Sequence, residues 1–228
     1  MLPNKKTARI AGLLFLLMVL SGLFAELFFR QRIFTDDAAG TTARILANPL
    51  LYRAGILSDI TMSLSYLLTA MALYSLLHTV DEGQAKAMVL FAAAGCVILM
   101  VNVLNEYMPL IYTSAQTSAF SAAQIGEFSQ FSFAAYNNGY MVGQVFFALW
   151  VLPLGILICR SGFIPRAFGI LFVVEAICGL LSVAVHFLLG NATIANLLLL
   201  PGMVAEFAFL AFLLVRGINT KKRITATV

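Results

Sequence analysis

Charged residues are scarce in this chain. Only 11% of its 228 residues are Asp, Glu, Lys or Arg, whereas 61% are hydrophobic. A soluble domain with this composition would have too little polar surface to cover its core, so a water-soluble globular fold is excluded. The formal net charge of +4 does not indicate nucleic-acid binding, because the cations lie beside the apolar runs, where they set membrane topology. We therefore expect a lipid bilayer around the chain and no nucleic-acid partner.

Cysteine and histidine are also scarce. The three cysteines show no CxxC spacing, which argues against a disulfide framework and a thiolate metal site. The two histidines are predicted on opposite sides of the membrane, His78 near the inside and His186 near the outside, so a multi-histidine zinc or haem centre is not expected. Phosphate-binding glycine loops and nucleophile elbows are missing from the sequence. We predict no metal and no cofactor. The one alternative is a metal site formed by Asp59, Glu106 and His186.

Six apolar runs are each long enough to cross a bilayer, which takes roughly 20 helical residues. Asn48 and Pro49, an N-cap and a first helical residue, open the second run. The predicted spans are residues 10–29, 49–78, 87–112, 131–159, 166–189 and 194–215. The sequence thus predicts an all-α fold, a polytopic membrane helix bundle with six transmembrane helices in a single transmembrane domain, residues 1–228.

Short motifs indicate where several of these helices begin and end. Gly162 is placed to close the fourth helix, and Pro165 to open the fifth. Ser121 and Gln124 have the spacing of a capping box, so the fourth helix is expected to begin outside the membrane. Residues 35–48, with Asp36 and Asp37 in the first turn, suit a short interfacial helix. Ordinary polar loops are the alternative for both external segments.

Positive charge is distributed unevenly between the two sides of the predicted bundle. With a cytoplasmic N-terminus, the inside holds ten of the 14 cations: Lys5, Lys6, Arg9, Lys86, Arg160, Arg166, Arg216, Lys221, Lys222 and Arg223. The outside holds the others, all in or beside the first external loop: Arg30, Arg32, Arg44 and Arg53. Cytoplasmic loops carry an excess of Lys and Arg. The count therefore predicts that both termini are inside (N-in and C-in).

Polar side chains gather in the external half of the spans. An ionisable group at the bilayer centre costs roughly 2.5–3.5 kcal/mol on insertion scales, so packing or function must compensate for it. Asn102, Asn105 and Glu106, spaced i, i+3 and i+4, share one helix face. The candidate ligand-binding residues are Asp59, Asn102, Asn105, Glu106, Tyr136, Asn137, Tyr140, Gln144, His186, Arg53 and Glu206. The internal halves contain long uncharged stretches, which favours an external pocket over a continuous pore.

Structural explanations compete with a binding site. Glu26 and Arg30 are one helical turn apart and can neutralise each other. Asp59 and Glu106 either contact a ligand or act as interhelical hydrogen-bond partners. Glu175 has no polar residue on its own helix face, which favours a protonated structural carboxyl. The role of Glu206 stays open; it follows Pro201, which can break the sixth helix locally.

Three segments resemble a known family. They are ARIAGLLFLL in the first span, LYRAGILSDI opening the second and RSGFIPRAFGILFV entering the fifth. All three resemble the bacterial membrane family known as domain of unknown function 4386, over nearly the whole chain. The resemblance implies a multi-pass protein of the bacterial cytoplasmic (inner) membrane. The family has no assigned activity, so the resemblance implies no catalytic residue.

Three classes of function remain. The first is a protein that binds a small polar, cationic or lipid-head ligand in an external pocket, with Asp59 and Glu106 as counter-charges. The second is a structural or partner-binding subunit, although no protein partner can be derived. The third is an intramembrane enzyme that uses Asp59 and Glu106 as acid and base on a lipid-linked substrate. Binding ranks first and catalysis last, since no catalytic motif is present.

Overall fold

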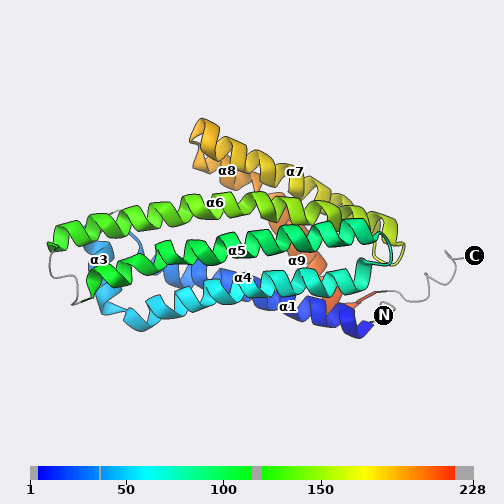
Figure 1. The fold of residues 1–228 in the computed structure, drawn as a ribbon, viewed down its shortest axis with the longest axis horizontal. Helices are drawn as coiled ribbons and strands as arrows, with labels where there is room; N and C mark the ends of the chain where they lie inside the picture. The colour runs from blue at the N-terminus through cyan, green and yellow to red at the C-terminus, as the bar shows by residue number, and fades with distance from the viewer. Residues whose placement is uncertain (1–4, 36, 115–119, 219–228) are drawn as a thin grey trace, which may run out of the picture. The chain divides into compact units, whose positions relative to one another are not determined.

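The computed structural model describes residues 5–35, 37–114 and 120–218, and the regular structure of these residues is helical (Figure 1). In chain order the elements are α1 (Lys5–Leu23), η1 (Phe24–Arg30), α2 (Gln31–Ile33), α3 (Ala38–Ala47), α4 (Pro49–Leu77), α5 (Glu82–Thr113), α6 (Ala122–Ser161), α7 (Arg166–Leu189), α8 (Ala192–Leu198) and α9 (Leu200–Val215). Six helical stretches are long and apolar enough to cross a membrane: Lys5–Ile33, Pro49–Leu77, Glu82–Thr113, Ala122–Ser161, Arg166–Leu189 and Ala192–Val215. The all-α, six-span prediction is confirmed.

Several helices extend beyond their apolar runs. The fourth helix begins at Ala122, whereas its predicted span begins at residue 131. The capping box explains this start: the Gln124 amide N–H donates to Ser121 Oγ at 3.3 Å, and the Ser121 amide N–H donates to Gln124 Oε1 at 2.9 Å. Both bonds satisfy donors that would otherwise be unpaired at the helix N-terminus. The helix therefore begins where its cap lies, before its sequence becomes apolar.

Glycines end two of the helices. Gly162 has φ +70 directly after α6, as predicted, and Gly190 has φ +62 at the end of α7, a left-handed conformation that glycine adopts without strain. The short helix predicted after the first span is present as α3, but its N-cap is Asp37, whose carboxylate accepts from the amides of Ala39 and Gly40. The predicted role of Asp36 lies outside the described residues, as do Lys221, Lys222 and Arg223.

Two spans are interrupted. In the first, the chain changes from α1 to the π-helical η1 before α2. In the sixth, Leu199 separates α8 from α9, two residues before Pro201. Proline has no amide hydrogen and clashes with the preceding turn, so it disfavours a continuous helix at this point, as predicted. Pro109 and Pro153, by contrast, lie within the continuous helices α5 and α6.

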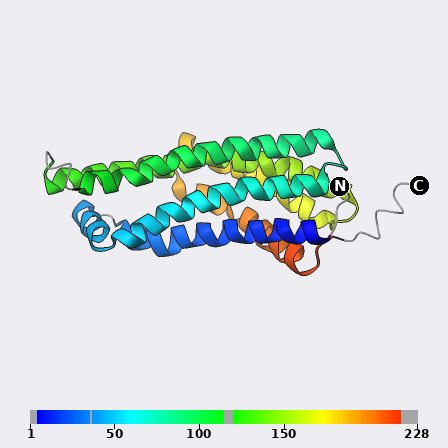
Figure 2. The same ribbon diagram turned by 60° about the horizontal axis from the view of Figure 1, so that its bottom comes forward.

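The chain divides into two compact units. The first unit comprises the described residues of Met1–Leu16, Ser65–Cys96 and Met141–Val228, and the second unit those of Leu17–Leu64 and Val97–Tyr140. The boundaries between the units fall within α1, α4, α5 and α6, so each of these helices contributes to both units. Figure 2 shows the helices in a second view.

Small residues bring helices close together in the first unit. A Cβ atom on Gly155 of α6 would lie only 2.7 Å from the backbone oxygen of Gly169 on α7. A Cβ atom on Gly179 would lie 3.0 Å from the Cβ of Ala148. α7 also packs against α8 and α9. Membrane helices associate through such small residues because the lipid surroundings provide no hydrophobic driving force between them.

An apolar cluster organises the second unit. Its buried members come from η1, α2, α3, α4 and α5: Phe29, Ile33, Ile45, Tyr52, Ile56 and Val103. The Phe29 ring meets the Tyr52 ring edge-on at 4.9 Å between centroids, and it lies directly over Gly55, where a side chain would collide with it. Packing of Phe29 therefore fixes the position of the next residue in η1, Arg30.

We expect Gly155→Ala to lower the free energy of unfolding by about 1–3 kcal/mol, because the new methyl group meets backbone atoms that cannot move aside. Thermal unfolding of the purified protein in detergent measures the change. Gly83→Ala is the matched control: it lies at the exposed start of α5, and its Cβ would meet only Asp81 Oδ1, at 3.4 Å. Unchanged stability in Gly155→Ala would contradict the close α6–α7 contact.

Candidate functional site

A buried arginine lies at the centre of the second unit. Arg30 Nη1 donates to Asp59 Oδ2 at 2.7 Å and to Glu106 Oε1 at 3.0 Å, and Nη2 donates to Asp59 Oδ1 at 3.4 Å. Arg30 is 8% exposed, while Asp59 and Glu106 are each 1% exposed. These contacts join η1 to α4 and α5 through three ionisable residues inside apolar helices.

A third carboxylate completes the group. Arg30 Nε donates to Glu26 Oε2 at 2.9 Å, and the Glu26 side chain is 56% exposed. The predicted Glu26–Arg30 pair is therefore confirmed, but it is only the exposed part of a larger set. We call Arg30, Glu26, Asp59 and Glu106 the Arg30 cluster.

The sequence-based prediction paired Arg30 with Glu26 alone and missed its contacts with Asp59 and Glu106. A usable signal was present in the sequence. Two carboxylates in separate spans, Asp59 and Glu106, had no cation on their own helix face, and Arg30 ends the first apolar run one turn after Glu26. Buried carboxylates need a charged partner, and Arg30 was a cation at the matching depth.

The helix that carries Arg30 is irregular. Glu26 and Arg30 both belong to the π-helix η1, a form that is rare in proteins and recurs at functional sites. On neighbouring elements, two tyrosines support the cluster: Tyr136 Oη donates to Asp59 Oδ2 at 3.4 Å, and Tyr52 Oη donates to the backbone oxygen of Glu106 at 2.7 Å. The Arg30 guanidinium also lies 5.0 Å from the centroid of the Tyr136 ring, within range of a cation–π interaction.

Charges in the Arg30 cluster do not balance one to one. Three carboxyl groups surround a single guanidinium. Glu106 Oε2 is buried and has no hydrogen-bond partner among the described residues. Uncompensated charge in an apolar interior is costly. Of the three carboxylates, only that of Glu26 is exposed.

The predicted asparagine stripe of α5 holds helices together. Asn102 Nδ2 donates to the backbone oxygen of Tyr136 on α6 at 2.9 Å, and Asn105 Nδ2 donates to Asn102 Oδ1 at 3.0 Å. Gly139 allows this approach, because a side chain there would collide with the Asn102 amide. The Asn102 amide thus joins α5 to α6, while the Asn105 amide bonds to Asn102 within α5.

A cavity of about 290 Å³ lies beside the Arg30 cluster. Its lining residues come from α1, η1, α4 and α6: Gly22, Glu26, Arg30, Met62, Tyr136, Asn137 and Tyr140. Three of the predicted ligand-binding residues, Tyr136, Asn137 and Tyr140, are in this lining. Asp59 and Glu106 are not; they lie behind Arg30 and bind it.

The remaining predicted site residues lie elsewhere. Arg53 is exposed on α4, one turn from the start of the helix. Gln144, His186 and Glu206 belong to the first unit, and their part in a site stays a prediction. Glu175 packs closely on Gly202 of α9, the helix that carries Glu206. Within the described ranges, no group of three or more His, Cys, Asp or Glu side chains is arranged to hold a metal ion.

Six apolar helical spans with an ion-paired cluster inside them define a multi-pass membrane protein, and lipid contacts its outer surface. The family model described as "Domain of unknown function (DUF4386)" matches residues 10–217, and the chain belongs to this family. This result confirms the resemblance drawn from the three sequence segments. No curated protein and no solved structure matches the chain.

We expect Arg30→Ala to destabilise the protein by about 3–5 kcal/mol, because it leaves Asp59 and Glu106 buried without a cation. Thermal unfolding in detergent measures the loss. Arg53→Ala removes an exposed arginine from the same unit and should leave the stability nearly unchanged. Equal stabilities for the two variants would contradict a structural role for the Arg30 cluster.

A triple variant separates charge from packing. Arg30→Met with Asp59→Asn and Glu106→Gln removes all three buried charges together, so no buried charge is left unpaired, and only the exposed Glu26 loses its partner. It should recover much of the stability lost in Arg30→Ala. If it is instead as unstable as Arg30→Ala, shape and hydrogen bonding outweigh charge at this site.

Proposed function

We propose that the protein is a ligand-binding or sensing protein of the bacterial inner membrane, whose ligand occupies the cavity beside the Arg30 cluster. One observation carries the proposal: a cavity of about 290 Å³, lined by a carboxylate, two tyrosines and an asparagine, lies among helices that are otherwise apolar. Pockets that recognise ligands combine an enclosed volume with a few converging polar groups. The size suits a small molecule or a lipid head group.

The lining favours a ligand that carries an ammonium group. Arg30 lines the cavity, but its Nε and Nη atoms already donate to three carboxylates. Glu26 is the exposed carboxylate of the cluster and provides the negative charge. The ring of Tyr140 provides an aromatic face, which attracts cations, whereas the ring of Tyr136 already lies against the Arg30 guanidinium. A primary amine would also find an acceptor in the side-chain oxygen of Asn137.

We further propose that the six helices form one transmembrane domain with both termini in the cytoplasm. The distribution of Lys and Arg supports this orientation. In this orientation η1, the start of α4 and the end of α5 lie toward the outside. The cavity would then take its ligand from the extracytoplasmic side or the outer leaflet.

A structural subunit is the second candidate. It is favoured by the mutual saturation of Arg30 and Asp59, which satisfies both groups without any ligand. Catalysis has less support: the carboxylates of Asp59 and Glu106 do not line the cavity, so neither reaches a substrate there as acid or base.

Neighbouring asparagines test the binding proposal. Asn137 and Asn138 are adjacent and exposed on α6, but only Asn137 lines the cavity. We expect Asn137→Ala to weaken binding about 5- to 10-fold through loss of one hydrogen bond, and Glu26→Gln to weaken it further. Asn138→Ala should bind like the wild type.

Native mass spectrometry with phosphatidylethanolamine and with free ethanolamine provides the measurement. Binding of the lipid alone assigns the cavity to a head group, and binding of ethanolamine assigns it to a soluble amine. Failure of both probes, or equal binding by the Asn137 and Asn138 variants, would refute the proposed ligand class.

Cysteine labelling tests the orientation. A membrane-impermeant maleimide should label Ala123→Cys in intact cells, because Ala123 lies at the exposed start of α6 on the predicted external side. Gly83→Cys, at the exposed start of α5, should react only after permeabilisation. The background carries serine at the three native cysteines. The reverse labelling pattern would invert the proposed topology.

A further inference from the structure

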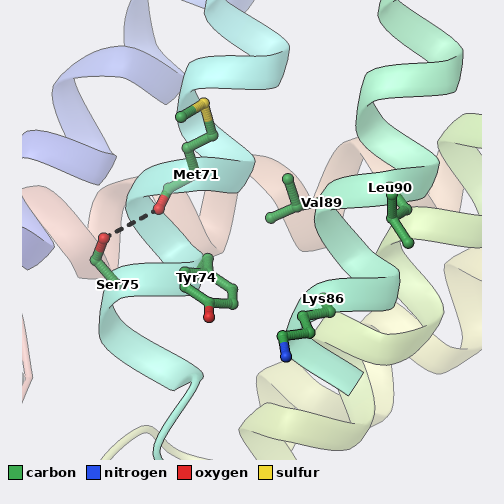
Figure 3. A pocket seen from close by; sticks show the side chains of 6 residues that line it. All are labelled: Met71, Tyr74, Ser75, Lys86, Val89 and Leu90. Atoms are coloured by element: carbon green, nitrogen blue, oxygen red, sulfur yellow. Dashed lines mark hydrogen bonds between the residues drawn. The ribbon is translucent and has the colours of Figure 1, made fainter. Parts of the chain in front are cut away.

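A second cavity lies in the first unit, between the end of α4 and the start of α5 (Figure 3). Its volume is about 490 Å³, within the usual range of ligand pockets. Figure 3 shows three lining residues on each helix: Met71, Tyr74 and Ser75 on α4, and Lys86, Val89 and Leu90 on α5. This cavity shares no residue with the one beside the Arg30 cluster.

Apolar side chains form one part of the lining. Met71 is 50% exposed and Leu90 is 69% exposed, so both side chains face the surroundings of the protein. Val89 lies between them in the lining. In a membrane-spanning helix pair, exposed apolar side chains contact lipid acyl chains. The groove can therefore be entered from the hydrocarbon region of the bilayer.

Polar side chains form the other part, toward the loop that joins α4 to α5. The Lys86 ammonium lies 2.9 Å from Glu82 Oε1, but both side chains are more than 60% exposed, at 62% and 63%. Exposed ion pairs of this kind contribute little and exchange readily. Lys86 is therefore available to another anion. Tyr74 lies on the facing helix and adds an aromatic ring with a hydroxyl group.

The position of Lys86 matches a membrane boundary. It is in the second turn of α5, four residues after Glu82, where the helix starts. Two other charged side chains near the start of α5, those of Asp81 and Arg160, pair with each other at 2.9 Å. Tyrosine and lysine are the residues that anchor helices at the boundary between head groups and hydrocarbon. The cavity thus has its charged end at head-group level and its apolar part deeper.

We propose that this cavity binds an anionic phospholipid, with one acyl chain against Met71, Val89 and Leu90 and the phosphate on the Lys86 ammonium. Charge complementarity selects this occupant, since Lys86 is the cation of the lining and the lining contains no carboxylate. On the proposed cytoplasmic side, membrane surfaces are rich in anionic lipids that attract such cations. The proposal does not depend on the amine-binding cavity, which has the opposite charge preference.

Native mass spectrometry of the protein with phosphatidylglycerol and with diacylglycerol, which carries neither a phosphate nor an amine, tests the proposal. The wild type should bind phosphatidylglycerol more strongly. Lys86→Gln should weaken that binding about fivefold, the effect of one cation near a lipid surface, whereas Lys86→Arg should retain it. Arg216→Gln is the matched control, because Arg216 is an exposed cation of the same unit outside the cavity.

A second variant tests the apolar part. Leu90→Trp fills the groove from an exposed position and should weaken the binding of both lipids, with thermal unfolding confirming that the variant is folded. Equal affinity of the wild type for the two lipids, or equal phosphatidylglycerol binding by the Lys86→Gln and Arg216→Gln variants, would overturn the anionic lipid site. Normal binding by Leu90→Trp would place the lipid outside this cavity.

Discussion

The second unit depends on one interaction, the contact of the Arg30 guanidinium with the carboxylates of Asp59 and Glu106. Each charge would be strongly unfavourable alone among apolar side chains, so the three groups are stable there only together. Because they come from η1, α4 and α5, their pairing fixes the relative depth of these elements. A shift of any one helix along its axis would leave a buried charge without a partner.

Local backbone structure makes this contact possible. The π-helix η1 carries both Glu26 and Arg30, and its Phe29 packs tightly over Gly55 and against Tyr52. Aromatic packing thus holds the irregular helix in place while the next side chain reaches the carboxylates. The helices of the first unit associate differently. Glycines such as Gly155 and Gly169 let the backbones of α6 and α7 approach closely, so van der Waals contact holds them together there.

The ion pairs of the Arg30 cluster account for two of the polar residues within the spans. The sequence leaves Asp59 and Glu106 either as counter-charges for a ligand or as interhelical partners, and in the structure they bind Arg30 of η1. In the proposed binding function, contact with a ligand falls instead to Glu26, Asn137 and Tyr140, which line the adjoining cavity. Under that proposal the Arg30 cluster supports one side of the pocket and supplies its carboxylate.

The sequence by itself determined the membrane class, the six spans and most helix ends, since hydropathy, capping residues such as Ser121 and prolines such as Pro201 act over a few neighbouring residues. It also determined the Glu26–Arg30 pair, a contact within one helical turn. Only the tertiary structure decided that Arg30 also binds Asp59 and Glu106 and that Asn102 reaches the backbone of Tyr136. These contacts join residues 29 to 76 positions apart along the chain. They depend on the rotation and depth of each helix, and helix periodicity fixes neither from one sequence.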